Sequence, residues 1–196
     1  AYEGQPCLSS NNVDLYFVSD REGGYGGKDI WFSHFENNYW SKPINMGPII
    51  NTPLDETAPF IHPDNETLYF SSNGHMGMGK NDLFVSRRNK NGTWKAPINL
   101  GSPINTTGFD GSIYVNAKGT MGYCASDRPD TRGGLDIYSF NLYPAIMPIP
   151  TICMKGFVLD KYRKTHQTLA DISFHLFKTK ELVADMESNV GDASYA

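Results

Sequence analysis

The sequence has little of what marks several large classes of protein. Only three of its 196 residues are cysteine, an odd number with no C-x-x-C pair, which argues against a disulfide framework and a zinc knuckle. No apolar run approaches the roughly 20 residues of a membrane-spanning helix, and the nearest candidate, 145–154, contains two prolines. The net charge of −4 comes without a polybasic segment, so neither nucleic acid nor an anionic lipid surface is an expected partner.

Runs of strong helix formers are also scarce, whereas turn and strand residues are abundant. The chain contains 19 glycines, 12 prolines, 11 tyrosines and 11 phenylalanines. Aromatic residues favour strands, and glycine and proline favour the turns between them. The composition therefore predicts an all-β fold.

An internal repeat organises the first 142 residues. LYFVSDR at 15–21 recurs as LYFSSNG at 68–74 and more loosely as GYCASDR at 122–128. Each copy is followed by a glycine-bearing loop that ends in an aspartate, at Asp29, Asp82 and Asp136. WSKPINMGPIINTP at 40–53 matches WKAPINLGSPINTT at 94–107, and the third copy lacks this tail.

Each repeat contains about four short strand-like runs separated by turn signals. In the second repeat these runs are 58–62, 67–72, 82–87 and 93–100. Four strands repeating at about 50 residues predict propeller blades, since a linear solenoid usually has shorter repeats. We therefore expect a partial β-propeller of three four-stranded blades at 1–142. Because propellers usually need at least four blades, we expect further blades upstream or in another copy of the chain.

The residue pattern of the repeat is similar to that of a known family. HPDNETLYFSSNGHMGMGKNDLFVS at 62–86 and its two relatives resemble the TolB-type, WD-repeat-like propeller repeat of bacterial envelope proteins. The resemblance covers residues 1–142. It implies a periplasmic propeller whose loops contact other proteins.

The rest of the chain does not follow the pattern of the repeat. Residues 143–151 are rich in proline and predict a linker. Residues 152–196 resemble the start of a carboxypeptidase-regulatory-like domain, a small transthyretin-like β-sandwich, through Lys155–Asp160 and Leu169–Phe174. We expect Ile172, Phe174 and Leu176 to alternate with polar neighbours, and the domain to be truncated.

This order of domains resembles that of OmpA-family envelope proteins of Bacteroidetes. The resemblance implies an outer-membrane-associated lipoprotein in the periplasm that has a peptidoglycan-binding domain outside this chain. It also implies other envelope or secretion-system proteins as partners, within type IX secretion.

Residues 74–80, GHMGMGK, match the first seven places of a phosphate-binding loop. Such a loop leads from a strand into a helix, whereas Lys80 here precedes Asn81, Asp82 and a strand-like run. A soft-metal site at His75, Met76 and Met78 is the other chemical interpretation, but the related loops lack these residues. The sequence predicts a hairpin loop, with neither a cofactor nor a metal.

The repeated polar residues favour structural roles. Asp29, Asp82 and Asp136 are expected to accept backbone N–H groups at the loop ends, with a ring of calcium ligands as the alternative. Asp20 with Arg21, and Asp127 with Arg128, are expected to form local ion pairs.

No catalytic residue is predicted, since neither a G-x-S-x-G nucleophile motif nor an H-E-x-x-H zinc motif occurs. Trp40 and Trp94 are expected to cover blade edges or pack between blades. A periplasmic glycan-binding or glycan-processing propeller, with these tryptophans as a sugar platform, stays open as the alternative function. The sequence favours a non-enzymatic interaction protein whose candidate partner-binding residues are Arg21, His75, Met76, Met78 and Arg128.

Overall fold

The chain divides into two compact units, Ala1–Thr151 and Ile152–Ala196. The computed structural model describes residues 1–152, 154, 156–158, 170–175, 179–180, 182–188 and 194–195. Every regular element in this described part is a β-strand, and the strand pairs within its sheets are antiparallel. The predicted all-β fold is confirmed.

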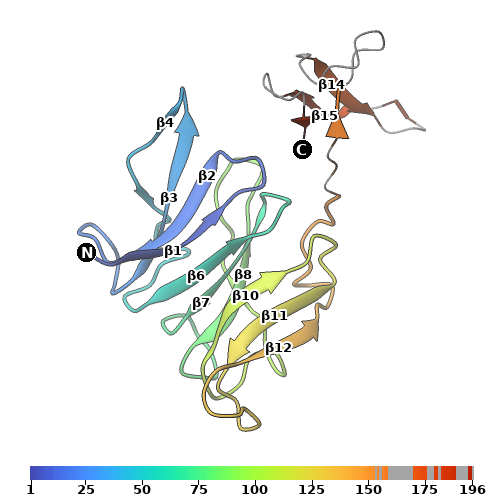
Figure 1. Ribbon diagram of the computed structural model, residues 1–196. Helices are drawn as coiled ribbons and strands as arrows, with labels where there is room; N and C mark the ends of the chain where they lie inside the picture. Colours follow the sequence, from blue (N-terminus) through green and yellow to red (C-terminus); the bar gives the residue numbers. More distant parts are fainter. Residues whose placement is uncertain are drawn as a thin grey trace. The chain divides into compact units, whose positions relative to one another are not determined.

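Three sheets of the first unit follow the three repeats along the chain (Figure 1). The first blade contains β1 (Glu3–Leu8), β2 (Asp14–Ser19), β3 (Asp29–Glu36), β4 (Tyr39–Trp40) and β5 (Ile44–Asn45). The second contains β6 (Glu56–Ile61), β7 (Thr67–Ser72), β8 (Asp82–Arg87) and β9 (Ile98–Asn99). The third contains β10 (Asp110–Val115), β11 (Met121–Ser126) and β12 (Asp136–Asn141).

The expected four strands per blade are found only in the second blade. The first sheet has five strands, because β4 and β5 pair with different parts of β3, and the third has three. The third repeat lacks the Trp-Pro-Ile-Asn tail that supplies the outer strand. In the second blade the predicted run 93–100 shortens to Ile98–Asn99, since Pro97 has no N–H for the ladder.

The first strand of every blade bends at the same place. The pairing register shifts between Gly4 and Cys7 and at the equivalent positions of β6 and β10, as in a β-bulge. One non-glycine residue with positive φ lies inside each bulge, namely Gln5 (52°), Ala58 (50°) and Ser112 (53°). The repeat therefore encodes the same bend three times.

We expect Ala58→Gly to stabilise the protein, because a left-handed backbone costs a non-glycine residue about 1 kcal/mol or more. Part of the gain is offset by glycine's larger entropy loss on folding, which leaves a net increase of about 0.5 kcal/mol in the free energy of unfolding. Urea denaturation followed by tryptophan fluorescence measures the change. Ala125→Gly, within β11 and outside the positive-φ set, is the control and should lower stability. Equal losses in both variants would contradict the strain at Ala58.

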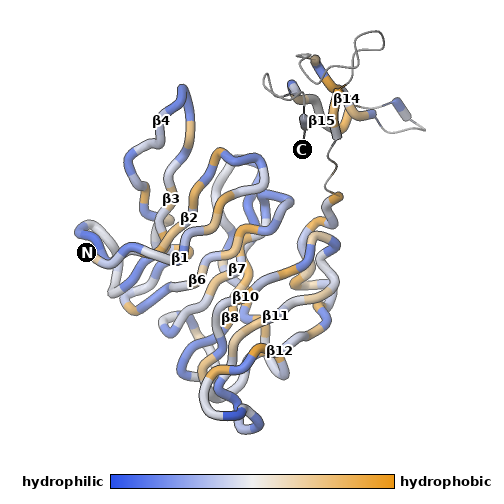
Figure 2. Tube along the Cα trace, viewed as in Figure 1, coloured by the Kyte–Doolittle hydropathy of each residue, from blue (hydrophilic) through white to orange (hydrophobic). Residues whose placement is uncertain are grey.

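The apolar core lies between neighbouring blades (Figure 2). One cluster joins the first and second blades, and its buried members are Tyr16, Ile30, Met46, Ile50, Ile61, Leu68, Phe70 and Phe84. The other joins the second and third blades, and its buried members are Tyr69, Leu83, Val85, Leu100, Ile104, Ile113, Val115, Cys124, Leu142 and Ile146. Alternate residues of β7 therefore face opposite blades, as the period of a strand requires. The tail after the first blade adds Met46 and Ile50 to the first cluster, and the tail after the second blade adds Leu100 and Ile104 to the second.

Residues 143–151, expected as a linker, lie against the blades. Ile146 is fully buried in the second cluster, and its carbonyl oxygen accepts the Tyr69 hydroxyl at 2.6 Å. The Arg87 guanidinium donates to the carbonyl oxygens of Ala145 and Met147. This segment covers Tyr69 at the junction of the second and third blades, as Trp94 covers Tyr16 at the junction of the first and second.

The second unit is described through four strands. β13 (Gly156–Phe157) pairs with β16 (Ser194–Tyr195), and β14 (Asp171–His175) pairs with β15 (Leu182–Glu187). Ile172 and Phe174 are less exposed than the polar neighbours with which they alternate, as predicted. Leu176, Lys155 and the motif residues 159–160 and 169 lie outside the described residues.

Candidate partner-binding site

All five predicted partner-binding residues lie in, or immediately beside, the loops that join the second and third strands of the blades. These loops are residues 20–28, 73–81 and 127–135, and we call them together the loop edge (Figure 1). The Gly27 N–H donates to the Leu54 carbonyl at 2.9 Å, and the Lys80 N–H to the Gly108 carbonyl at 2.8 Å. The first and second loops are therefore each anchored to the connection that enters the next blade.

The aspartate that ends each loop closes it through backbone hydrogen bonds. Asp82 Oδ2 accepts the Met78 N–H at 2.6 Å, and Asp136 Oδ2 accepts the Arg132 N–H at 2.7 Å. Asp29 accepts the Tyr25 N–H in the same way. The predicted structural role of the three aspartates is confirmed. Among the described residues, no group of three or more His, Cys, Asp or Glu side chains could hold a metal ion.

Glycine is required next to these carboxylates. A side chain at Gly77 would place its Cβ 2.0 Å from Asp82 Oδ2. At Gly24 the same atom would lie 2.3 Å from Asp29 Oδ2. The glycines of GHMGMGK thus allow a tight turn between two antiparallel strands, β7 and β8. The prediction of a hairpin loop is confirmed.

The repeated asparagines of the tails complete the loop bases. Asn99 Nδ2 donates to Asp82 Oδ2 at 3.0 Å, and Asn99 Oδ1 accepts from Asn105 Nδ2 at 2.8 Å. Asn45 and Asn51 repeat both bonds in the first blade. Because the network is the same in two blades, these residues hold the fold rather than a blade-specific ligand.

The predicted Asp–Arg pairs are wrong, because each member bonds to a residue 18 positions earlier. Arg21 pairs with Glu3, and Arg128 Nη2 lies 3.2 Å from Asp110 Oδ1. Asp20 instead accepts the Tyr2 N–H, and Asp127 accepts the Phe109 N–H. Neighbours in sequence at a strand end point in different directions, so the acid and the base meet different parts of the preceding strand.

His75 takes over an arginine's role in the second blade. Arg128 Nη2 donates to the Ile104 carbonyl at 3.0 Å. The aligned position in the second blade is Gly74, and there the His75 Nε2 lies 2.8 Å from the equivalent Ile50 carbonyl. The imidazole also packs against Phe70 and Phe84. His75 is therefore a half-buried structural group at the base of the loop.

Glu56 is buried at the same junction without an arginine partner. Its carboxylate accepts the hydroxyl groups of Ser72 and Thr52 and the Thr52 N–H. Burial raises the pKa of Glu56, and these hydrogen bonds partly oppose the increase. The position is taken by Glu3 in the first blade and Asp110 in the third, so this unusual carboxylate also belongs to the repeat.

The second loop of the loop edge exposes two apolar side chains. Met76 is 94% exposed and Met78 45% exposed. Two further residues that the sequence analysis missed, Tyr25 and Leu54, are exposed on adjoining segments. A side chain at Gly74 would come within 3.2 Å of the Leu54 Cβ, so Leu54 adjoins the loop that carries the methionines. Apolar residues in turn-like sequence were the signal available for both.

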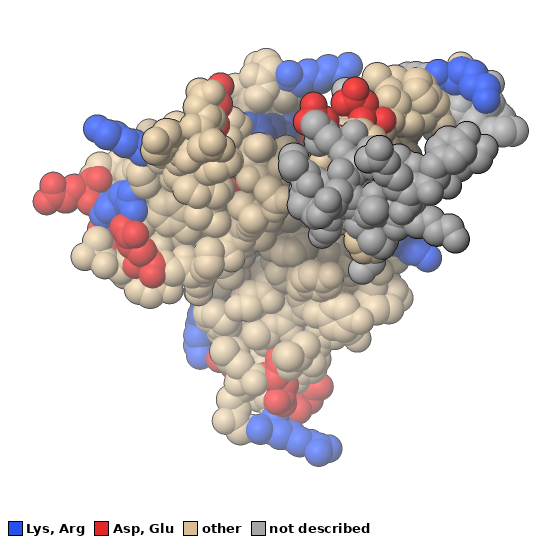
Figure 3. All heavy atoms as spheres, turned by 45° about the horizontal axis from the view of Figure 1, so that its top comes forward, with Lys and Arg blue, Asp and Glu red and all other residues tan. Residues whose placement is uncertain are grey.

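Charge is dispersed on the described surface. On the face shown in Figure 3, acidic and basic side chains lie mostly near the rim, and some of opposite sign lie side by side. No helix in the described part of the chain has the length and hydrophobicity to span a bilayer. Met76 and Met78 therefore offer an apolar contact within an edge that also exposes charged side chains.

Comparisons with known proteins support the fold. No protein-family model matches the chain, and no curated protein matches it. The crystal structure of TolB from Acinetobacter baumannii superposes with a TM-score of 0.51 and 13% identity, over 97% of this chain and 41% of that one. An α-L-arabinofuranosidase from Lactobacillus brevis superposes with a TM-score of 0.52 and 15% identity, over 74% of this chain and 51% of that one.

The chain thus spans 41% and 51% of the two solved structures. At these identities the likeness concerns the fold alone. Three repeated antiparallel sheets packed face to face, together with these two superpositions, show that the first unit has a β-propeller fold.

Proposed function

We propose that the protein is a non-enzymatic, periplasmic interaction scaffold of the cell envelope, and that its loop edge binds another envelope protein. The observation that carries the proposal is the exposure of Met76 and Met78 on a loop whose base is fixed by Asp82. Methionine suits such a surface, because its flexible thioether adapts to an apolar partner. A contiguous exposed apolar patch commonly marks an interaction site.

The repeated carboxylates support a role without catalysis. A glycosidase needs two carboxyl groups that face the scissile bond. Asp29, Asp82 and Asp136 accept backbone N–H groups, and Glu56 and Asp110 hold the tails of the preceding blades. Their roles recur from blade to blade, as expected for structural groups.

The wider setting follows from the sequence resemblance. The domain order resembles that of PorE, a component of the type IX secretion system, and the TolB likeness fits a periplasmic propeller. We propose that the protein acts in type IX secretion at the outer membrane. A domain outside this chain would bind peptidoglycan.

Affinity capture from envelope extract, with the full-length protein as bait, tests the proposal. Met76→Asp with Met78→Asp is expected to reduce the captured secretion-system components at least about tenfold, since loss of interface anchors typically costs 2 kcal/mol or more. Unfolding free energy should change by less than about 0.5 kcal/mol, because both side chains are exposed.

Met154→Asp is the matched control, because Met154 is an exposed methionine outside the loop edge. It should leave capture unchanged. Equal capture by wild type and the double variant would remove the loop edge from the proposal. Hydrolysis of an oligosaccharide panel by the purified protein would overturn the non-enzymatic role.

A further inference from the structure

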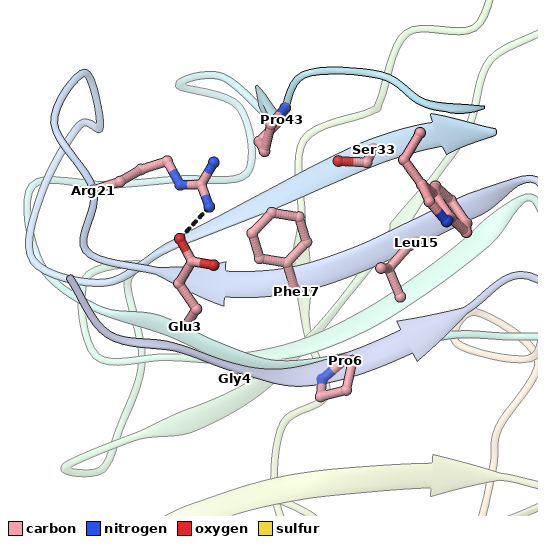
Figure 4. Close-up of a pocket in the computed structure, with 9 residues that line it drawn as sticks. Glu3, Gly4, Pro6, Leu15, Phe17, Arg21, Ser33 and Pro43 are labelled. Atoms are coloured by element: carbon pink, nitrogen blue, oxygen red, sulfur yellow. Dashed lines mark hydrogen bonds and ion pairs between the residues drawn. The ribbon is translucent and has the colours of Figure 1, made fainter. Parts of the chain in front are cut away.

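The outer face of the first blade carries an open pocket of about 460 Å³. Its lining is mostly apolar and includes Leu15, Phe17, Trp40 and Pro43. Glu3 and Arg21 form an ion pair at one end (Figure 4). Met76 and Met78, on which the proposed partner binding rests, do not line this pocket.

The repeat shows what covers the same face in the second blade. Leu68 and Phe70, the equivalents of Leu15 and Phe17, are fully buried in the cluster shared with the first blade. Trp94, the equivalent of Trp40, meets the Tyr16 ring edge-on at 6.4 Å. A tyrosine of the first blade's second strand, Tyr16, therefore lies on the second blade at the place that corresponds to the open pocket of the first blade.

The tail of the first blade occupies the polar end of this place on the second blade. Glu56, the equivalent of Glu3, accepts the Thr52 N–H at 2.6 Å and the Thr52 hydroxyl at 2.7 Å. His75 lies 2.8 Å from the Ile50 carbonyl oxygen. The tail segment Ile50–Asn51–Thr52 is therefore held between a carboxylate and a nitrogen donor.

The junction of the second and third blades repeats this arrangement with an arginine. Asp110 accepts the Thr106 N–H at 2.6 Å and the Thr106 hydroxyl at 2.8 Å. Arg128 Nη2 donates to the Ile104 carbonyl at 3.0 Å and lies 3.2 Å from Asp110. An Ile-Asn-Thr tail is thus recognised twice, each time by an acid at the same position and by a nitrogen donor from the loop after the second strand, His75 or Arg128.

The first blade has both halves of this recognition pair. Glu3 and Arg21 occupy the positions of Asp110 and Arg128, and each arginine Nε donates to the serine two residues earlier. The Glu3 side chain is 56% exposed, whereas the Asp110 side chain is fully buried. Figure 4 shows the pair beside Phe17, with the pocket open in front of it.

We propose that this pocket is a docking site for a further blade of the same repeat type, whose Ile-Asn-Thr tail is held by Glu3 and Arg21. The occupant carries a tyrosine on its second strand that packs edge-on against Trp40, and an apolar residue at the position of Ile30. These are the features that the first blade itself presents to the second. Of the residues used here only Arg21 lies in the loop edge, and this docking does not rest on the partner proposed for Met76 and Met78.

An extended chain tests the proposal directly. A second copy of residues 1–53 is placed before Ala1, so that Pro53 of the added copy precedes Ala1–Tyr2–Glu3. This join preserves the repeat register, because Leu54–Asp55–Glu56 follows Pro53 in the natural chain. Tethering also gives the added blade a high effective concentration at the pocket.

Carbodiimide labelling of carboxyl groups, read by mass spectrometry, measures the docking. Labelling of Glu3 at the new junction is expected to fall at least about tenfold relative to the natural chain, because tethered docking keeps the site occupied. Exposed Glu22 is the internal reference and should stay labelled. The two copies of Glu3 are distinguishable, since only one lies in a peptide that begins before Pro53. Absence of label at buried Asp29 reports that both copies are folded.

Tyr16→Asp in the added copy is the matched control, and it should restore labelling of Glu3. Undiminished labelling in the unmodified extended chain would overturn the proposal. An added copy that stays unfolded, with Asp29 labelled, would overturn it too, because docking supplies the apolar contacts that fold a blade. Protection of Glu3 in the natural chain as its concentration rises would show that the face binds a second copy instead.

Discussion

Asn105→Ala is expected to lower the free energy of unfolding of the first unit by about 2–4 kcal/mol, since it leaves the buried Leu83 N–H without a partner, at about 1–3 kcal/mol, and removes further hydrogen bonds at about 1 kcal/mol. Asn105 is 1% exposed, and its Oδ1 accepts the Leu83 N–H at 2.8 Å. Its Nδ2 donates to the Leu83 carbonyl at 2.9 Å. The side-chain amide therefore continues the ladder beside the Leu100 N–H, which also donates to the Leu83 carbonyl, at 3.0 Å. Alanine leaves the Leu83 N–H buried without a partner and adds a small cavity.

Urea denaturation followed by tryptophan fluorescence measures this loss, because Trp31, Trp40 and Trp94 all lie in the first unit. Asn91→Ala is the matched control. Asn91 is exposed in a turn and bonds only to Thr93, so its loss should change stability by less than about 0.5 kcal/mol. A loss below 1 kcal/mol for Asn105→Ala would mean that water or a rearranged tail satisfies Leu83.

The same argument applies to Asn51, whose amide pairs with both backbone groups of Ile30. The recurrence of Ile-Asn at a fixed offset from Trp40 and Trp94 was visible in the sequence. It correctly indicated a structural role, since two blades do not share a ligand site by accident. The bonding partner was not visible, because an amide that bridges a tail to a strand follows no sequence period.

The sequence predicted the blades well because one unit of strand-like runs recurs three times, and turns that contain glycine or asparagine separate the runs. It failed where contacts depend on side-chain direction at a strand end. Arg21 and Arg128 reach acids on the preceding strand. His75 is displaced by one position from the arginine that it replaces, so alignment placed Gly74 there and concealed the exchange. The exposure of Tyr25 and Leu54 depends on loop geometry, which neither composition nor periodicity encodes.

The first blade shows why a repeat helps more than a single domain would. The two occupied blade junctions show which groups hold an Ile-Asn-Thr tail, and they thereby indicate what the open face of the first blade would bind. A lone apolar pocket carries no such information, since many partners fit an apolar wall. In this chain the acid and the arginine at the end of the pocket have equivalents that hold such a tail at the occupied junctions.

Asp64→Asn is expected to remove about 2 kcal/mol of pH-dependent stability, the linkage value of a pKa lowered by about two units. Burial alone raises the pKa of Asp64, but hydrogen bonds from His62, Thr67 and the N–H groups of Glu66 and Ile149 lower it to about 2, from 3.8. The bond from Ile149, at 2.9 Å, ties the segment after the third blade to a turn of the second.

The sign follows from the direction of the shift. Because the folded pKa is the lower one, the stabilisation by Asp64 is fully present above pH 3.8 and is lost as the pH falls through about 2. The difference in unfolding free energy between wild type and Asp64→Asn should therefore be largest near pH 6 and shrink by about 2 kcal/mol towards pH 2. Glu36→Gln, which removes one exposed negative charge, is the control and should show a much smaller change. A difference that stays constant from pH 6 to pH 2 would show that the Asp64 carboxylate does not hold residues 143–151 to the blades through its charge.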